Sequence, residues 1–269
     1  MLTTARNIVT LTRSSGACGY SGDGGPVSSA ALSTNPLLSK LAISPNGDVA
    51  IADTQNHAIR RVFNPSATSM SIKAVSNAAS FEIGYIVPGE IITAFGTSFT
   101  SSGLESAAPA NGVYPTQLRQ TRLLVDGVPA PLIYVSPDQL SAIVPFAVAG
   151  RPNVRITIEN GSDRSPQFLA TIGGTQPGIF TLDGSGRGLV AAINAQDATI
   201  NGPNTPARRG SVVTIFATGL GTLSPTLRDG EVAGFNLSNV TAAVDVTVSG
   251  FTATVTYAGS APGLVAGVY

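Results

Sequence analysis

Few residue types in this sequence could carry out acid–base, nucleophilic or metal chemistry. Among its 269 residues there is one histidine, His57, and one cysteine, Cys18. Asp53 precedes His57 by four positions, and a carboxylate of this kind could orient an imidazole that acts as a general base. Both residues lie in a polar turn between apolar runs, however, and turn side chains usually bond the local backbone. We therefore assign Asp53 and His57 a structural role and predict no catalytic residue.

The other candidate motifs lack the partners that their chemistry requires. The Gly-x-Ser-x-Gly turn of a serine nucleophile is absent. The glycine-rich segment Gly184–Gly188 could bind phosphate at the start of a helix, but strand-like runs flank it, so we predict a β-turn. Gly22–Gly25 and Asp183–Gly184 could offer oxygen ligands to calcium, although neither has the spacing of an EF-hand. We predict no cofactor and no metal site, with calcium as the alternative ion.

The charge and hydropathy patterns exclude several classes of partner. The sequence has 15 basic and 15 acidic residues, and only 11% of its residues are charged. It therefore has no long-range field that would attract nucleic acid or an anionic membrane. No uninterrupted apolar run approaches the ~18 residues of a membrane-spanning helix. We expect a protein or glycan partner, no nucleic acid and no membrane insertion.

The composition favours short strands joined by tight turns. Hydrophobic residues make up 43% of the sequence, and it contains 30 glycines and 18 prolines. This composition is similar to that of secreted β-sandwich modules, which leads us to expect an extracellular or cell-surface location. The N-terminal residues lack the pattern of a signal peptide. A leader would then belong to a longer parent protein, of which we expect this chain to be a fragment.

Residues 36–63 have the pattern of an antiparallel meander. An Asn-Gly turn and a polar turn separate the apolar runs Leu41–Ile43, Asp48–Ala52 and Ala58–Phe63. The segment Leu41–Val62 resembles an NHL repeat, and Gly19–Pro26 resembles the connector before such repeats. The resemblance implies one propeller blade within residues 1–64. A propeller needs at least about four blades, so one repeat cannot close it.

An internal duplication extends from Lys73 to Tyr269. The segment Gly89–Phe99 parallels Gly210–Leu220, and Val125–Tyr134 parallels Val248–Tyr257. Each copy contains short strands with alternating apolar residues, which is typical of a sandwich. We expect a linker at 65–72 and two tandem immunoglobulin-like β-sandwiches at 73–172 and 173–269. The fold class is therefore all-β, with the two sandwiches preceded by a single NHL-type meander.

Two further expectations follow from the alignment of the two copies. Tyr134 and Tyr257 occupy equivalent positions, which favours a structural role in each sandwich over contact with a ligand. The second copy lacks the equivalent of a strand, so we expect a C-terminally truncated sandwich. Its unpaired edge is expected beside Leu264, Val265 and Val268.

The duplicated region also resembles a known family. The matching segments are Val75–Phe81, Val87–Gly96, Pro131–Leu140, Pro177–Phe180, Ala207–Gly210, Ala217–Gly221 and Tyr257–Leu264. They are similar to the C-terminal domain family of large acidobacterial surface or secreted proteins. This resemblance implies IPT/TIG-like immunoglobulin sandwiches in an extracellular setting, but no activity, ligand or catalytic residue.

The sequence thus predicts a non-catalytic structural, adhesion or protein-binding module of a larger NHL-repeat surface protein. Its support is architecture, because no ligand-binding residue can be named. The alternative is a carbohydrate-binding accessory module of a secreted enzyme, which an exposed row of aromatic residues on one sheet would indicate. A catalytic function would require polar groups that converge in a pocket.

Overall fold

The computed structural model describes residues 19–21, 30–33, 40–43, 49–62 and 70–269. It divides the chain into two compact units, Met1–Thr68 and Ser69–Tyr269, which are described separately. The regular elements of the described residues are β-strands and short 3-10 turns, so the all-β class is confirmed. No helix long and apolar enough to cross a membrane occurs in this part of the chain.

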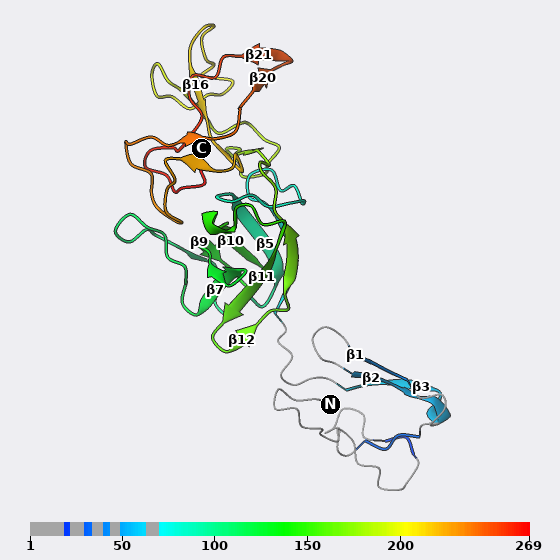
Figure 1. Ribbon diagram of the computed structural model, residues 1–269. Helices are drawn as coiled ribbons and strands as arrows, with labels where there is room; N and C mark the ends of the chain where they lie inside the picture. Colours follow the sequence, from blue (N-terminus) through cyan, green and yellow to red (C-terminus); the bar gives the residue numbers. More distant parts are fainter. Residues whose placement is uncertain (1–18, 22–29, 34–39, 44–48, 63–69) are drawn as a thin grey trace. The chain divides into compact units, whose positions relative to one another are not determined.

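The first unit contains a three-stranded antiparallel sheet with strand order β1-β2-β3 (Figure 1). Its elements are β1 (Leu41–Ile43), β2 (Val49–Asp53), the 3-10 turn η2 (Thr54–Asn56) and β3 (Ala58–Val62). Val49 and Ile51 are buried on one face of β2, whereas Ile59 is 81% exposed. The predicted meander is confirmed, and its Asn-Gly turn lies outside the described residues.

The second unit begins with two five-stranded arrangements. The first sheet has the order β4 (Ser71–Asn77), β5 (Ile91–Thr97), β10 (Gln139–Ile143), β9 (Leu132–Val135) and β6 (Glu105–Ser106). The second has the order β12 (Asp163–Arg164), β11 (Asn153–Asn160), β7 (Thr121–Val125) and β8 (Val128–Pro129), and β13 (Phe168–Thr171) also pairs with β11. The short 3-10 turn η3 (Phe146–Val148) follows β10.

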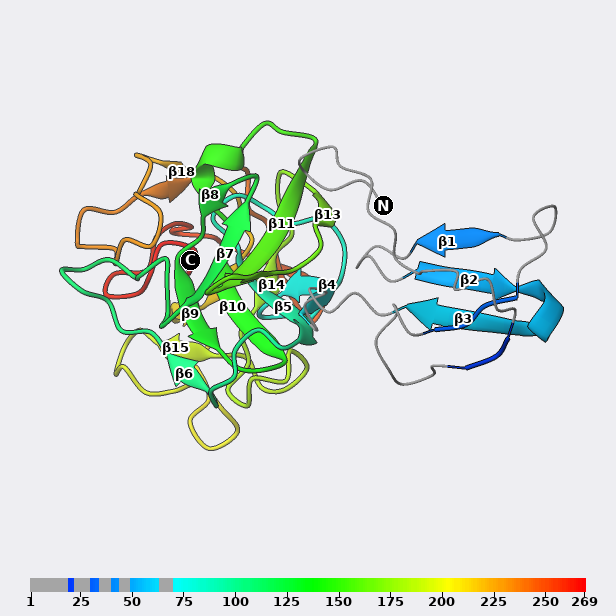
Figure 2. The same ribbon diagram turned by 90° about the horizontal axis from the view of Figure 1, so that it is seen from below.

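One hydrophobic core joins these two sheets into a sandwich (Figure 2). Alternate side chains of each strand point to the same face, so a strand contributes every second residue to the core. Ile92 on β5 and Leu140 on β10 belong to the same buried cluster as Leu123 on β7 and Ile156 on β11. All four side chains are 0% exposed. β4 begins at Ser71, so the end of the expected linker lies in a strand and the linker's residues 65–69 lie outside the described part.

Residues 173–269 pair their strands two at a time. The pairs are β14 (Gly178–Ile179) with β17 (Ala217–Thr218), β15 (Ala192–Asn194) with β16 (Val213–Ile215), β18 (Leu223–Ser224) with β19 (Asn239–Val240), and β20 (Val246–Val248) with β21 (Phe251–Ala253). We call residues 70–172 the first half of the second unit and residues 173–269 its second half. The second half is therefore less regular than the first, although both belong to one compact unit.

The two halves share the geometry of a strand and the turn after it. The last residue of β4 is Asn77 and the last residue of β15 is Asn194. The N–H of each asparagine donates to the carbonyl five positions later, which is Glu82 for Asn77 and Thr199 for Asn194. The carbonyl of each asparagine accepts the N–H four positions later, which is Phe81 for Asn77 and Ala198 for Asn194. The residue four positions later has a left-handed φ in each case, 58° at Phe81 and 56° at Ala198. This correspondence supports the internal duplication.

A second correspondence lies in the hairpins β7–β8 and β20–β21. Each has a two-residue turn in which both φ angles are positive, as in a type I′ hairpin. The angles are 48° and 83° at Asp126 and Gly127, and 51° and 84° at Ser249 and Gly250. The paired segments of the sequence therefore fold alike locally, although the strands around them differ.

The expected open edge beside the C-terminal residues is wrong in its location. Val265 is 6% exposed and forms an antiparallel bridge with Val232. The backbone of Tyr269 exchanges two hydrogen bonds with Ala217, at 3.0 and 2.9 Å. The segment instead returns against β17, whereas β16, β20 and β21 each have a paired strand on one side only among the described residues.

Candidate functional site

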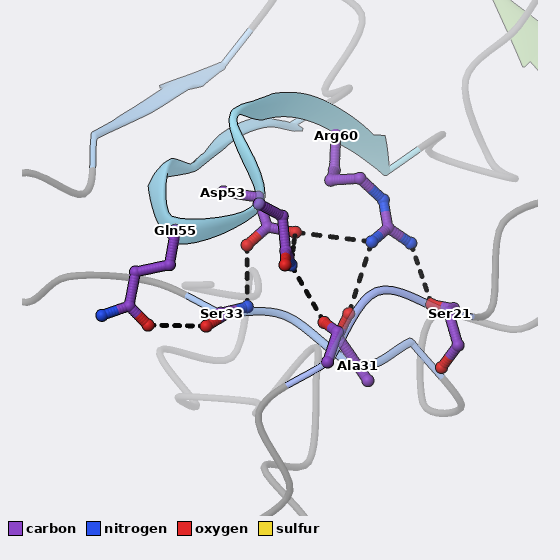
Figure 3. Close-up of polar contacts among 8 residues, drawn as sticks. Ser21, Ala31, Ser33, Asp53, Gln55 and Arg60 are labelled. Atoms are coloured by element: carbon purple, nitrogen blue, oxygen red, sulfur yellow. Dashed lines mark hydrogen bonds and ion pairs between the residues drawn. The ribbon is translucent and has the colours of Figure 1, made fainter.

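Asp53 is the centre of a buried polar network in the first unit (Figure 3). The side chain is 0% exposed, and its Oδ1 accepts the backbone N–H of Ser33 at 2.7 Å. Its Oδ2 accepts the amide of Asn56 at 2.9 Å and lies 3.5 Å from the guanidinium of Arg60. Gln55 accepts the hydroxyl of Ser33 at 2.6 Å. The network thus attaches the segment around Ser33 to the turn at the end of β2.

Arg60 extends this network to two more segments. Its guanidinium donates to the carbonyl of Ala31 at 3.3 Å and to that of Ser21 at 3.0 Å. It also lies 4.7 Å from the ring centroid of Tyr20, within the range of a cation–π contact. Because Arg60 is 8% exposed and Asp53 is 0% exposed, each charge depends on the other for its stability inside the unit.

Asp53 and His57 make separate contacts in the structure. His57 is exposed and ends the turn η2 with a left-handed φ of 53°, and its N–H bonds the carbonyl of Thr54. Asp53 bonds Ser33, Asn56 and Arg60 and has no hydrogen bond to His57 among the described contacts. Asp53 therefore bonds the backbone of a distant segment and two side chains, and not the local backbone that the sequence analysis expected.

The remaining residues singled out in the sequence lie in turns and loops. In the segment Gly184–Gly188, the carboxylate of Asp183 accepts the N–H and hydroxyl of Ser185 at 3.0 and 2.8 Å, which lowers its pKa. The other calcium candidate, Gly22–Gly25, lies outside the described residues, as does Cys18. Among the residues that the structure describes, no group of three or more His, Cys, Asp or Glu side chains could hold a metal ion.

The two equivalent tyrosines have different surroundings. The hydroxyl of Tyr134, on β9, donates to Gln139 at 3.5 Å. The hydroxyl of Tyr257 donates to the carbonyl of Ser260 at 2.8 Å and lies 3.3 Å from that of Ser238. Tyr257 thus connects two loops of the second half. The residue remains 41% exposed.

A buried carboxylate, Glu90, lies where the two halves of the second unit meet. It is 0% exposed. One oxygen accepts the side-chain amide of Asn77 at 2.7 Å, and the other accepts the N–H of Val87 at 2.7 Å. The Asn77 amide also donates to the carbonyl of Gln176, in the second half, at 3.0 Å. Asn77 therefore couples Glu90 directly to the second half.

Further hydrogen bonds join the halves around Glu90. The N–H of Ile91 donates to the hydroxyl of Thr218 at 2.8 Å, and the N–H of Phe146 donates to the carboxylate of Asp229 at 2.8 Å. Within the second half, beside this junction, the hydroxyl of Tyr269 donates to the carbonyl of Gly221. Sequence analysis missed this junction because its members are far apart in the chain.

Burial controls the ionisation of the junction. Transfer of a carboxylate from water to a protein interior favours its neutral form. Burial accordingly raises the pKa of Glu90 to about 7, although hydrogen bonds from Val87 and Asn77 act in the opposite direction. Burial, with the nearby charge of Glu90, also raises the pKa of Tyr269. Ionisation of Glu90 near neutral pH thus places a charge inside the junction.

The second half exposes apolar side chains at positions that the first half buries. Val125, before the hairpin turn of β7–β8, is 0% exposed, whereas its equivalent Val248 is 59% exposed. Across the turn, Val128 is half-buried and its equivalent Phe251 is 78% exposed. Val248 and Phe251 are directly paired in the register of the hairpin. They form an exposed apolar pair, which we call the hairpin patch.

A polar hollow of about 250 Å³ lies in the first half of the second unit. Its lining residues are Thr100, Ser101, Ser102, Arg119, Gln120 and Asn160. Small-molecule sites are commonly larger, about 300–1,000 Å³, and mostly apolar. The hairpin patch is therefore the stronger candidate for a binding surface.

Comparisons with known proteins give no relative from which a function could be transferred. No family model, no curated protein and no solved structure matches the chain. The functional argument therefore depends on the geometry of the described residues.

Replacement of Asp53 by alanine should release the segment around Ser33. The change removes the acceptor of the Ser33 N–H and leaves the charge of Arg60 without its carboxylate. Hydrogen exchange measured by NMR should be at least about tenfold faster at the Ser33 amide. The matched control is Gln55→Ala, which removes only the partner of the Ser33 hydroxyl. An unchanged rate in Asp53→Ala would show that the network does not hold the segment.

The stability of the second unit should fall as pH rises from about 4.5 to about 7. The pKa of Glu90 is raised, so the folded state retains a proton in this range that the unfolded state loses. Its contribution is complete below the unfolded pKa of 4.5 and is lost as pH rises through about 7. The total change is on the order of 3 kcal/mol in the free energy of unfolding.

Urea unfolding followed by the methyl NMR signals of buried Leu123 measures this dependence in the second unit. Glu90→Gln, which cannot ionise, should flatten it, whereas substitution of the exposed Glu82 by glutamine should preserve it. If Glu90→Gln kept the same dependence of the free energy of unfolding on pH as the parent chain, another group would be responsible for it.

Proposed function

We propose that this protein is a non-catalytic, extracellular structural or adhesion module that binds a protein partner through the second half of its second unit. One observation carries the proposal. Positions that are buried in the first half have equivalents in the second half that expose apolar side chains, as Val125 and Val248 do at 0% and 59%. Exposed apolar surface of this kind commonly marks a protein-interaction site.

The surrounding architecture fits this function. In this proposal the sheet β1-β2-β3 is one NHL-type blade of a larger surface protein, and the two halves of the second unit are IPT/TIG-like immunoglobulin sandwiches. The antiparallel meander, the sandwich of the first half and the repeated turn geometry support these assignments. The first half supplies a rigid support through its large core, and the second half presents the hairpin patch.

A carbohydrate-binding function is the alternative because aromatic rings are also exposed. Phe235, Phe251 and Tyr257 are 95%, 78% and 41% exposed. A stacking platform for sugars would place such rings in a row on one sheet. Of these rings only Phe251 lies in a strand, whereas Phe235 and Tyr257 lie in loops. This distribution favours a protein partner.

Replacement of the hairpin patch should abolish partner binding. The chain with Val248→Ser and Phe251→Ser loses apolar surface but no backbone hydrogen bond, so its fold should persist. Cross-linking with extracellular proteins, followed by mass spectrometry, should recover a specific partner with the parent chain and at least tenfold less with the variant. Leu169→Ser is the matched control, since Leu169 is 68% exposed in the first half.

Parallel assays separate the other functions. Binding to a glycan array that depends on Phe251 would favour the carbohydrate-binding module. Saturable turnover of ester, glycoside or phosphate substrates, with or without divalent metal, would overturn a non-catalytic function. Partner recovery that is equal in the parent and in the hairpin variant would contradict the proposed surface.

A further inference from the structure

Three segments of the first half come together around the polar hollow, at one end of the sandwich. They are the loop after β5, the turn before β7 and the last residue of β11, which pairs with β12 at this end (Figure 1). The hollow encloses about 250 Å³, and its lining residues are Thr100, Ser101, Ser102, Arg119, Gln120 and Asn160. Every lining residue is polar, which distinguishes the hollow from the mostly apolar sites of drug-like molecules.

Thr121 connects all three segments. It pairs with Asn160 in the register of β7 and β11, and its hydroxyl donates to the carbonyl of Phe99 at 3.1 Å. Thr121 and Phe99 are 1% and 0% exposed. The N–H of Gly161 also donates to the carbonyl of Gln120 at 3.1 Å. The walls of the hollow are therefore fixed to the buried frame of the sandwich, which lowers the cost of ordering them around a ligand.

Arg119 has a backbone conformation that arginine rarely adopts. It is the first residue of a two-residue turn between Leu118 and Thr121, whose backbones exchange hydrogen bonds at 3.0 and 2.8 Å. Its φ is 50°, in the left-handed region, where glycine is the residue without strain. Strained residues cluster at sites that use the side chain they carry. An arginine at this position therefore favours a role of its side chain at the hollow.

The charge of Arg119 is already paired, while most of its donors remain available. Its Nε donates to the carboxylate of Glu105, on β6. A guanidinium carries five N–H donors, and the other four have no partner in the described part of the chain. No other charged residue lines the hollow. The site can thus donate hydrogen bonds to an uncharged ligand, because the carboxylate of Glu105 balances its one charge.

The other lining side chains also have unused hydrogen-bonding groups. Within the described residues, the hydroxyls of Ser101 and Ser102 and the amides of Gln120 and Asn160 have no hydrogen bond. The hydroxyl of Thr100 accepts the N–H of Ser102 at 3.1 Å and keeps its own proton for a further bond. Hydroxyls and amides both donate and accept. The matching ligand has several groups that also do both, close together on a small frame.

We propose that the polar hollow binds one uncharged sugar ring, either a free monosaccharide or the end of a glycan. Adjacent hydroxyls of a pyranose match the amides of Gln120 and Asn160, each of which presents a donor beside an acceptor. The hollow is smaller than the about 300–1,000 Å³ of sites for drug-sized ligands, which limits it to a single ring. The inference goes beyond the proposed protein-binding function, because it assigns a second ligand to the first half.

Titration of the full chain with uncharged pyranosides tests the site. The probes are the methyl glycosides of glucose, galactose and mannose, each added separately while the backbone amides are followed by NMR. At least one probe should shift the amides of Ser101, Gln120 and Gly161 in a saturable manner. The dissociation constant should be on the order of 1 mM, because no aromatic ring in the hollow adds stacking. No saturable shift at these amides with any probe at about 50 mM would overturn the proposal.

Two substitutions at the surface test whether the amides hold the sugar. Asn160→Ala and Gln120→Ala should each weaken binding of the glycoside at least about threefold, since each removes hydrogen bonds to the ligand. The matched control is Asn153→Ala, which removes the same kind of side chain from the other end of β11, outside the hollow. Equal affinity in the parent, Asn160→Ala and Gln120→Ala would overturn the site.

Arg119→Gly separates a binding role of Arg119 from a structural one. Glycine adopts the left-handed φ without strain, so the midpoint of urea unfolding should not fall. The affinity for the glycoside should nevertheless fall at least about threefold, because the guanidinium donors are lost. A lower midpoint with unchanged affinity would show that the arginine supports the fold and would contradict its place in the site.

Further probes define the ligand class and its source. Methyl glucuronide carries a carboxylate on the same ring, and binding more than about tenfold tighter than that of methyl glucoside would overturn an uncharged ligand. A disaccharide that ends in the bound sugar should match the monosaccharide in affinity if the source is a glycan end, and its failure to bind would support the free monosaccharide. The chain with Val248→Ser and Phe251→Ser should bind the glycosides as the parent does, so this site and the hairpin patch are tested independently.

Discussion

A β-strand inside a sheet pairs its backbone groups along both edges and buries at least one of its faces, whereas an edge strand leaves one row of these groups unpaired. The first half of the second unit meets both requirements for β5, which lies between β4 and β10 and contributes Ile92 to a shared core. The second half meets them only in part, because β16 pairs with β15 alone and its inward side chains are half-buried. This difference between the halves underlies the proposal that the first half is a support and the second a binding surface.

The junction between the halves depends on a carboxylate that is costly to ionise. Glu90 accepts two hydrogen bonds, yet its burial raises its pKa to about 7. Asn77 joins Glu90 to Gln176, so ionisation of Glu90 acts on a contact between the first and second halves. Close packing leaves little room for adjustment there, since a Cβ at Gly89 would lie 2.4 Å from the ring of Phe146. The contact between the two halves is thereby linked to protonation of Glu90 near neutral pH.

Local patterns in the sequence predicted local structure well. Alternating apolar runs and turn residues predicted the meander β1-β2-β3, and the aligned segments Val125–Tyr134 and Val248–Tyr257 share a hairpin turn of the same kind. Local reasoning placed Asp53 in a turn but did not give its backbone partner, because Ser33 lies 20 positions away in the sequence. Its ion pair with Arg60 could have been suspected from the alternation of β3, which turns Arg60 inward.

Properties that depend on distant pairing could not be predicted in this way. Nothing local indicates that Glu90 is buried, because its surroundings are completed by residues as remote as Gln176. The open edge was placed beside Val265 from the alignment, whereas the chain pairs Val265 with Val232 and leaves β16 uncovered. Burial of equivalent residues such as Val125 and Val248 diverges because β11 covers β7, while β20 and β21 pair only with each other.

Amide hydrogen exchange in the free chain tests most directly whether the edge of β16 is unpaired where the equivalent edge of β5 is paired. The amides of Ile92 and Ala94 face β10, and those of the equivalent Val213 and Ile215 face no described strand. We predict that exchange at Val213 and Ile215 is at least a hundredfold faster, after correction for intrinsic rates, than at Ile92 and Ala94. Equal protection of the two pairs would contradict the account, because it would show that the edge of β16 is already covered.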